Sequence, residues 1–254
     1  MGGQLLIGVP VYGQQEMTHD LVRDLWRENA DFVIIDNRGD YRPLGDERVE
    51  RPGQNLGWAG GSNLGFRLAF SEGYANAMTL NNDTRLSLGY VAALLDPALP
   101  ADLGMVATVY DDKYAISKML SDYDGPAEQY VPRHRYREMT FIDGTGLLIT
   151  RDAWRAVGGL DERTFGDYAW GADRDLSARV RDAGFKIYVT ERGFMNHLRQ
   201  KTVSTMTSAS RYKLRAYREM TAGMRRIGMR HRLKADDEAP YVVHDFDHRV
   251  DQIR

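Results

Sequence analysis

The chain has 254 residues, and its hydrophobic content of 43% suffices for one large or two small domains with an apolar core. Its 34 Lys and Arg residues nearly balance 36 Asp and Glu residues, so the formal net charge of -2 gives no overall attraction to nucleic acid. The absence of cysteine excludes disulfides, thiolate metal sites and a cysteine nucleophile. No run approaches the roughly 20 apolar residues of a membrane span, and Pro10 interrupts the N-terminal run too early for a signal peptide. We therefore expect a soluble cytoplasmic protein.

The first half of the chain alternates apolar runs with segments of helical spacing. Apolar runs predict strands over 5–11, 32–35, 77–80 and 104–109. Apolar residues at helical spacing follow at 21–26, at 66–70 after a Gly-rich loop, and at 88–95. This alternation predicts an α/β fold with a mostly parallel central sheet flanked by helices.

The second half is less regular. Residues 111–139 are rich in tyrosine and polar residues and predict a loop-rich excursion, after which 141–149 return to strand character. Helices are expected over 151–157 and 173–183, followed by a last strand over 185–189. A basic helix is expected over 211–234, and the acidic final twenty residues are expected to fray. We predict a main domain over 1–204 and a C-terminal helical extension with an acidic tail over 205–254.

A carboxylate and two amides follow the predicted strand at 77–80, in the sequence Asn81-Asn82-Asp83-Thr84. A strand end that presents Asp83 to a crevice suits a divalent cation on a diphosphate, because hard cations prefer oxygen ligands. The same tetrapeptide is also ordinary turn chemistry. Asp36 ends another buried strand and could contact a nucleobase or ribose, or it could cap the turn that follows it.

The usual nucleotide and hydrolase motifs are missing from the sequence. It contains no G-x-G-x-x-G, no phosphate-binding loop ending in Lys-Ser/Thr, no His-Glu-x-x-His and no Gly-x-Ser-x-Gly. A dinucleotide-dependent dehydrogenase and a P-loop NTPase are therefore disfavoured.

The order of the remaining motifs resembles a family 2 glycosyltransferase of the GT-A fold over roughly residues 5–204. The motifs that carry the resemblance are Val9-Pro10-Val11-Tyr12, Ile35-Asp36-Asn37, the loop with Asn55, Gly57, Gly61, Asn63 and Gly65, Asn81-Asn82-Asp83, Gly144 to Glu162, Ala172 to Arg179, and His197. The form Asn-Asn-Asp-Thr looks most like the rhamnosyltransferase-type members. Ala172 stands where the family usually has Glu, which puts the positioning of the acceptor in doubt.

The resemblance implies a role for individual residues. The residues expected to bind the nucleotide sugar are Pro10, Tyr12, Asp36, Asn55, Gly57, Asn63 and Asn82. Asp83 is the best candidate ligand for Mn²⁺ or Mg²⁺, and the resemblance nominates His197 as a second ligand. The alternative for His197 is a surface or hydrogen-bonded loop histidine. We place Asp143 and Trp170 on the acceptor side. The aromatic faces of Trp170 and of the tyrosines in 111–139 can stack on sugars, and core or interface packing is the alternative for each of them.

Asp173 is the candidate general base, since an inverting transfer needs one group to take the proton of the acceptor hydroxyl. Its alternative role is a carboxylate at a helix N-terminus, where the helix dipole is expected to lower its pKa. Asp175, two residues further on, is expected to pair with Arg179 at i+4.

These observations predict an inverting, metal-assisted transferase that moves a sugar from a nucleoside-diphosphate donor to a glycan, lipid-linked or protein acceptor. A non-catalytic module that binds nucleotide sugars or glycans is the alternative, and a nucleotidyltransferase ranks third. The basic helix at 211–234 could contact an anionic membrane surface, bind a partner protein, or dock on the domain with solvated arginines. Homo-oligomerisation stays open.

Overall fold

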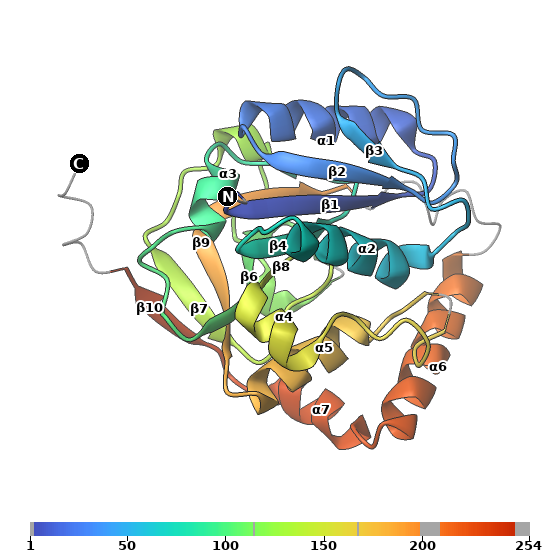
Figure 1. Cartoon of the computed structure of the whole chain (residues 1–254). Helices are drawn as coiled ribbons and strands as arrows, with labels where there is room; N and C mark the ends of the chain where they lie inside the picture. Colours follow the sequence, from blue (N-terminus) through green and yellow to red (C-terminus); the bar gives the residue numbers. More distant parts are fainter. Residues whose placement is uncertain (1–2, 114, 167, 199–208, 247–254) are drawn as a thin grey trace.

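The computed structural model describes residues 3–113, 115–166, 168–198 and 209–246 (Figure 1). The described strands are β1 (Leu5–Val11), β2 (Asp31–Asp36), β3 (Arg48–Glu50), β4 (Asn76–Leu80), β5 (Thr84–Leu86), β6 (Leu103–Tyr110), β7 (Arg135–Met139), β8 (Gly146–Thr150), β9 (Lys186–His197) and β10 (Val242–Asp245). The described helices are α1 (Gln15–Arg27), α2 (Gly57–Ser71), α3 (Tyr90–Leu94), α4 (Arg151–Val157), α5 (Ala172–Asp182), α6 (Ala209–Arg226) and α7 (Arg230–Glu238), with short 3₁₀ turns at Ser117–Met119 and Ala127–Gln129.

All these strands join one mixed sheet in the order β10-β7-β9-β6-β8-β4-β1-β2-β3, with β5 paired to β9. Strands β4, β1, β2 and β3 are parallel neighbours, and so are β6 and β9. Strand β8 runs antiparallel between β4 and β6, and β7 and β10 extend the sheet in antiparallel fashion. The parallel pairs confirm the predicted α/β architecture, whereas β3, β5, β7 and β10 were not predicted.

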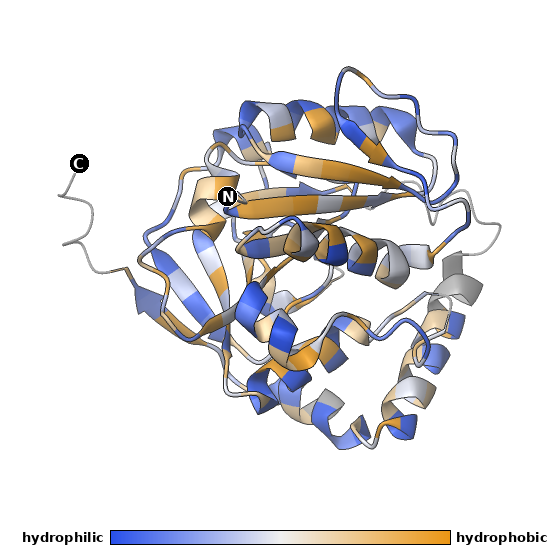
Figure 2. Cartoon of the chain, viewed as in Figure 1, coloured by the Kyte–Doolittle hydropathy of each residue, from blue (hydrophilic) through white to orange (hydrophobic). Residues whose placement is uncertain are grey.

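Helices cover both faces of the sheet, with α1 and α3 on one side and α2, α4 and α5 on the other (Figure 1). The central strands are hydrophobic, and the outer helices are hydrophilic on much of their surface (Figure 2). Close packing of α2 on β1 depends on two glycines, because a Cβ atom at Gly8 would lie 3.1 Å from the Gly65 Cα atom. This contact brings the start of α2 to the edge of the sheet at which β1 ends.

The C-terminal region is more ordered than the sequence indicated. The predicted basic helix is two helices, α6 and α7, separated by Gly228 at a φ of +71°. Helix α6 docks on the domain through the buried residues Ala216 and Met224, and Gly223 packs against Phe165. The prediction that the last twenty residues fray is wrong for 235–246, because α7 continues to Glu238 and β10 pairs with β7. Residues 247–254, and the predicted domain boundary at 204/205, lie outside the described residues.

Across the described segments, no helix is long and apolar enough to cross a membrane.

Candidate active site

Polar side chains gather at one edge of the sheet because five strands end there and one begins there. Parallel pairing brings the ends of β1, β2 and β4 together, and β8 reverses direction so that β6 and β9 end at the same edge. The segments that meet there are Val11–Tyr12, Asp36–Asn37, Asn81–Asp83, Tyr110–Asp112, Asp143–Thr145 and Asn196–His197. In α/β sheets, ligands bind in the crevice outside the carboxyl ends of the strands.

Asp83 and His197 face each other at this edge. Strand β9 continues beyond its predicted end at 189 to His197, and β5 pairs with it so that Thr84 lies opposite His197. As a result, the His197 Nε2 atom lies 3.5 Å from Asp83 Oδ1, and the two side chains are only 8% and 18% exposed. His197 thus does not lie on a surface loop, but its side chain is hydrogen-bonded, so its role as a metal ligand stays a prediction.

Asp112, at the end of β6, fixes the imidazole from the opposite side. Its Oδ2 atom lies 2.8 Å from His197 Nδ1. Burial opposes protonation of His197, but its hydrogen bonds with Asp112 and Asp83 outweigh this effect and raise its pKa to about 9. Asp111 accepts a hydrogen bond from the His197 backbone N–H at 2.9 Å, which locks the strand end in place. Neither Asp111 nor Asp112 was singled out from the sequence, although the pair directly follows a predicted strand.

The Asp83–His197 pair fits a divalent cation that is shared with a ligand. Asp83 offers carboxylate oxygens, and His197 offers Nε2 once a cation displaces its proton, while Asp112 holds Nδ1 in the way that carboxylates commonly orient metal-binding histidines. The described residues contain no cluster of three or more His, Cys, Asp or Glu side chains suited to hold a metal ion. A cation held here would take its remaining ligands from a bound diphosphate and water, because hard cations take six or more ligands in such sites.

The two amides of the turn before Asp83 make contacts within the protein. Asn81 Oδ1 accepts a hydrogen bond from Trp58 Nε1 at 3.1 Å, and Asn82 Nδ2 donates to Thr18 Oγ1 at 2.9 Å. Both bonds fix the turn that carries Asp83. The predicted contact of Asn82 with the nucleotide sugar stays a prediction.

Asp173 lies at the start of α5, next to a loop that carries Asp143. The Asp173 Oδ2 atom accepts a hydrogen bond from the Gly144 N–H at 3.2 Å, and Oδ1 accepts one from the Arg174 N–H at 2.8 Å. Residues 141–145, which were predicted to belong to a strand, form this loop instead, because β8 begins only at Gly146. A side chain at position 144 would overlap the Trp58 ring, so glycine is required for this approach.

The prediction that the helix dipole lowers the pKa of Asp173 is wrong. Burial raises the pKa of this carboxyl to about 6, and the nearby charge of Asp143 acts in the same direction. Although part of its surface is exposed, Asp173 is densely surrounded by protein, and desolvation exceeds the effect of its backbone hydrogen bonds. Asp143 is itself held by Tyr110, whose hydroxyl donates to Asp143 Oδ2 at 2.9 Å. A carboxyl of this pKa is suited to accept a proton near neutral pH.

Further expectations from the sequence concern residues at and near α5. Trp170, just before α5, is 36% exposed, and its contact with an acceptor stays a prediction. Asp175 pairs with Arg179 at 2.7 Å, which confirms the predicted i+4 pair. Ala172 is fully buried, so it packs in the core and leaves no surface to contact an acceptor.

A small hollow of about 170 Å³ lies on the side of the site where we expect the nucleotide to bind. It is lined by Gly13 to Gln15, after β1, and by Arg38, Asp40 and Tyr41, after β2. Tyr12 is 55% exposed next to it, with the Arg38 guanidinium 5.9 Å from its ring centre.

Asp36 is buried below this loop. Its carboxylate accepts hydrogen bonds from the N–H groups of Gly39 at 2.8 Å and Tyr41 at 2.9 Å. This is the turn-capping role that the sequence left open, so a contact of Asp36 with the nucleotide stays a prediction.

The Asn/Gly-rich motif shapes the start of α2. Asn55 Oδ1 accepts a hydrogen bond from the Gly57 N–H at 2.9 Å, and Gly57 has a φ of +67°. Further along, Gly61 packs against Pro10, where a Cβ atom would lie 3.1 Å from the proline ring. Contacts of Pro10, Asn55 and Gly57 with the donor therefore stay predictions.

Asn63 is buried in α2 and holds the loop that precedes α5. It accepts a hydrogen bond from the Leu160 N–H at 2.8 Å, donates to the Leu160 carbonyl at 2.8 Å, and donates to Glu162 at 2.7 Å. Its polar atoms are used within the protein, so its predicted contact with the nucleotide sugar also stays a prediction.

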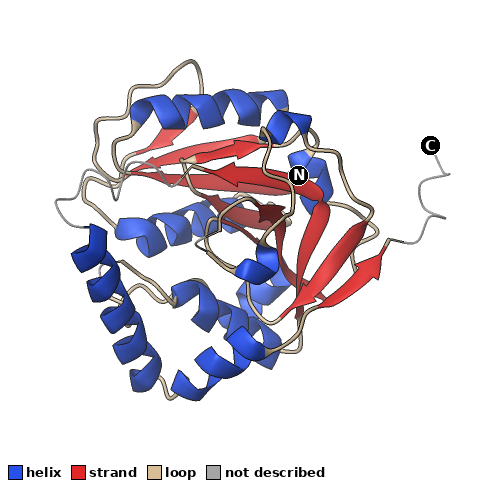
Figure 3. Cartoon of the chain, turned by 180° about the vertical axis from the view of Figure 1, so that it is seen from behind, coloured by secondary structure: helices blue, strands red, loops and turns tan. Residues whose placement is uncertain are grey.

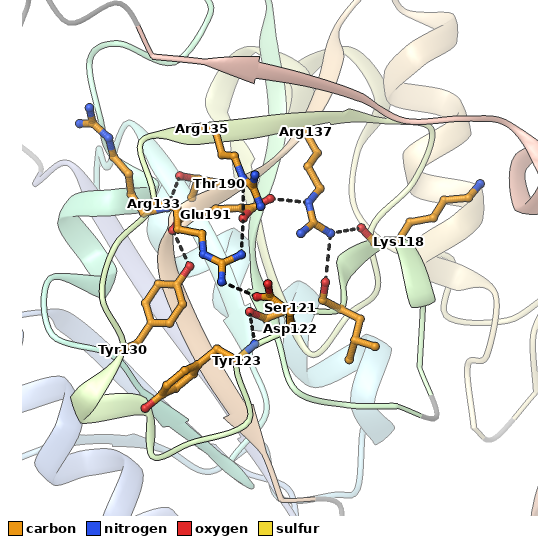
Figure 4. Close-up of polar contacts among 12 residues, drawn as sticks. Lys118, Ser121, Asp122, Tyr123, Tyr130, Arg133, Arg135, Arg137, Thr190 and Glu191 are labelled. Atoms are coloured by element: carbon orange, nitrogen blue, oxygen red, sulfur yellow. Dashed lines mark hydrogen bonds and ion pairs between the residues drawn. The ribbon is translucent and has the colours of Figure 1, made fainter.

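A buried glutamate anchors the 111–134 segment, which carries Asp111 and Asp112 (Figure 4). Glu191 in β9 is 1% exposed and pairs with Arg137 at 2.8 Å and Arg135 at 2.9 Å. Arg137 also donates to the carbonyl of Lys118 at 2.6 Å, which ties the segment to the sheet. Tyr130 of this segment stacks on Phe194, so this tyrosine serves packing.

Comparisons with known proteins identify relatives of this chain and solved structures with a similar fold. No family model matches the chain. "Uncharacterized protein Rv1525" from Mycobacterium tuberculosis (strain ATCC 25618 / H37Rv) and "Uncharacterized protein Mb1552" from Mycobacterium bovis are each 55% identical to it over 222 residues. The aligned part is 87% of this chain and 84% of each relative.

Three solved structures share the architecture. The mannosyltransferase PcManGT from Pyrobaculum calidifontis, in complex with GDP-Man and Mn²⁺, has a TM-score of 0.62 at 12% identity and matches 93% of this chain. GalNAc-T7 with UDP, GalNAc and Mn²⁺ has a TM-score of 0.54 at 13% identity, and S. aureus TarS 1–349 in complex with UDP has one of 0.53 at 11%, each over 76% of this chain. This chain spans 66%, 43% and 60% of those three chains, respectively. At these identities the likeness concerns the fold alone, and it confirms the predicted GT-A fold.

Proposed function

We propose an activity for the family of the mycobacterial proteins Rv1525 and Mb1552, to which this chain belongs: transfer of a sugar from a nucleoside-diphosphate donor to an acceptor hydroxyl, with inversion and with the help of Mn²⁺ or Mg²⁺. One observation carries the proposal. The edge of the sheet holds a carboxylate–imidazole pair suited to a cation, and a separate carboxyl with a pKa of about 6. The hydrogen bond from Trp58 to Asn81 and the packing of Trp58 on Gly144 connect the two.

On the donor side, Asp83 and His197 Nε2 would hold the cation, and Asp112 keeps the imidazole turned toward it. When bound, the cation supplies positive charge that neutralises the diphosphate as it leaves. The hollow beside Tyr12 and Arg38 lies at the same edge and would receive the nucleoside. The neighbours solved with GDP-Man and with UDP support a nucleoside-diphosphate ligand at this edge.

On the acceptor side, Asp173 takes the proton of the attacking hydroxyl. The acceptor oxygen forms a bond to the anomeric carbon as the bond from that carbon to the diphosphate oxygen breaks, and the proton goes to an Asp173 carboxylate oxygen. Asp143 raises the proton affinity of Asp173 and lies where it could accept a hydrogen bond from the acceptor. Hexosyl and rhamnosyl donors are both compatible with this chemistry, and the Asn-Asn-Asp-Thr motif favours a rhamnosyl donor.

The decisive test separates donor binding from transfer. A thermal-shift screen with UDP, GDP and dTDP sugars and Mn²⁺ identifies the donor. Asp173→Asn should then bind this donor with nearly parental affinity and lose transfer, whereas full transfer by this variant would contradict the assignment of the base.

A second experiment tests the metal role. The affinity for the nucleoside diphosphate, measured by calorimetric titration with and without Mn²⁺, should differ strongly for the parent and much less for Asp83→Ala. Equal binding in all four titrations would refute the metal role.

A second candidate is a GT-A-like module that binds nucleotide sugars or glycans without catalysis. Ala172 favours it, because this fully buried alanine stands at the position where the resembled family carries Glu. The two candidates differ in slow donor hydrolysis, since a pure binding module does not release free nucleotide from its ligand. Release of nucleotide that depends on Asp173 would exclude the binding module.

A further inference from the structure

A second cavity, away from the strand ends, lies between the loop that leads into α5 and the exposed helix α6. It has a volume of about 400 Å³, within the range of about 300–1,000 Å³ typical of small-molecule sites. Figures 1 and 3 both show α6 on the side of the molecule toward which β1 and β2 point. Met220 of α6 packs on Gly171, two residues before Asp173, so α6 lies close to the proposed acceptor side.

Three arginines line this cavity. Arg163 comes from the loop, and Arg218 and Arg226 come from α6, about two turns apart. Arg226 donates to the Thr164 carbonyl at 3.3 Å, which holds it against the loop. Within the part of the chain that the structure describes, neither Arg163 nor Arg218 forms an ion pair, so both guanidinium groups are available to a ligand.

The single carboxylate of the lining does not neutralise these charges. Glu219 is already paired through Oε1 with Arg215 at 2.7 Å. Its Oε2 atom is buried and accepts no hydrogen bond from any described residue. The cavity therefore carries surplus positive charge, which favours an anionic ligand.

The helix is held rigidly enough to form a site. Met220 packs on Gly171, directly before α5, and Gly223 packs on Phe165, so the α6 backbone is fixed against both ends of the loop. Gly166, in the middle, has a φ of +68° and lies under the Glu219 carboxylate. Arginines presented from a fixed helix and a fixed loop can bind a phosphate through the two-pronged hydrogen bonds that guanidinium groups form with it.

We propose that the cavity lined by Arg163, Arg218 and Arg226 is a binding site for the phosphate group of a ligand that approaches the acceptor side. The link to the acceptor rests on the proposed glycosyl transfer, whereas phosphate binding itself does not. The phosphate could belong to a lipid headgroup or to a soluble phosphorylated compound, and both have the chemistry that this cavity recognises.

The test measures phosphate binding by the full chain without metal, so that a metal-dependent donor site does not contribute. The probes are inorganic phosphate, followed by calorimetry, and phosphatidylcholine vesicles with or without phosphatidic acid, followed by co-sedimentation. In the double variant Arg163→Ala/Arg218→Ala, the affinity for the probe that binds the parent should fall by about tenfold or more, because charge-assisted hydrogen bonds to phosphate are lost. Glu219→Gln should strengthen binding by severalfold, because it removes the only negative charge of the lining.

Arg225→Ala is the control for position, because it removes one positive charge from an exposed position of α6 outside the cavity, and Arg218→Ala alone is its single-charge counterpart inside the cavity. Binding of inorganic phosphate without vesicle binding would indicate a soluble ligand, and vesicle binding that requires phosphatidic acid would indicate a lipid. The proposal is overturned if neither probe binds the parent, or if the double variant binds as the Arg225→Ala control does. Failure of sugar transfer would leave these titrations intact, so the two proposals fail separately.

Discussion

Asn63 offers a direct choice between a structural role and a role in donor binding. Its side chain makes three hydrogen bonds to the loop at Leu160 and Glu162, at 2.7 to 2.8 Å, and it is only 7% exposed. Each such bond contributes about 1 kcal/mol net, and its loss leaves buried groups of Leu160 without partners. We therefore expect Asn63→Ala to lower the free energy of unfolding by about 3 kcal/mol.

Urea denaturation at neutral pH measures this change. For an m value of about 3 kcal/mol/M, the expected loss lowers the unfolding midpoint by about 1 M. Asn55→Ala is the matched control, because Asn55 belongs to the same motif but is exposed and makes one hydrogen bond, to Gly57, so its loss should cost about 1 kcal/mol or less. If Asn63→Ala unfolds at the parental midpoint and yet fails to bind the donor, the structural explanation is wrong and the nucleotide role predicted from the sequence is right.

Three further predictions concern the site and its support. Because burial raises the pKa of Asp173 from 3.8 to about 6, the base is protonated below pH 6, and the transfer rate should fall about tenfold per pH unit there; a pH–rate profile that stays flat to about pH 4 would indicate an ordinary aspartate. Asp112→Ala should weaken Mn²⁺ binding in the presence of the nucleoside diphosphate by about tenfold or more, as followed by the electron paramagnetic resonance of free Mn²⁺; unchanged affinity would show that the imidazole needs no orienting carboxylate. Glu191→Gln should lower the free energy of unfolding by about 3 kcal/mol in urea, because it leaves the buried Arg137 without its counter-charge; the loss should clearly exceed that of Asp122→Asn, whose exposed pair with Arg133 is worth about 1 kcal/mol at most.

The sequence predicted the parts of the fold that rest on continuous apolar runs. The hydrophobic pattern correctly placed strands β1, β2, β4 and β6, because burial on both faces of a parallel sheet produces continuous apolar runs. It also placed helix α4. Strand β7 escaped notice because it reads as polar. Its residues Arg135 and Arg137 face a buried Glu191 from the neighbouring strand, and this partner is 54 residues or more away along the chain. A pattern of single residues does not reveal that pairing.

The residues of the candidate site, too, were predicted only in part. Asp83, His197 and Asp173 were nominated because they belong to recognisable motifs, and the structure brings the first two of them together. Asp112 was missed because its role depends on the pairing of β6 with β9, which no local spacing reports. The pKa of Asp173 was misjudged for a related reason. The helix dipole is a local effect that the sequence shows, whereas the burial of Asp173 and the nearby charge of Asp143 are properties of the folded chain.

The candidate site draws its residues from the ends of separate strands, which has a consequence for folding: Asp83 precedes β5, Asp112 follows β6 and His197 ends β9. His197 ends the last central strand, and its hydrogen-bond partner Asp112 lies 85 residues earlier. Contacts over such separations form late and slow the folding of a chain. A shortened chain that ends before β9 would lack this constellation altogether, however well its first strands pair. A cation held there would bind the complete fold and not the unfolded chain, so it would stabilise the protein by mass action, and the unfolding temperature would report its binding.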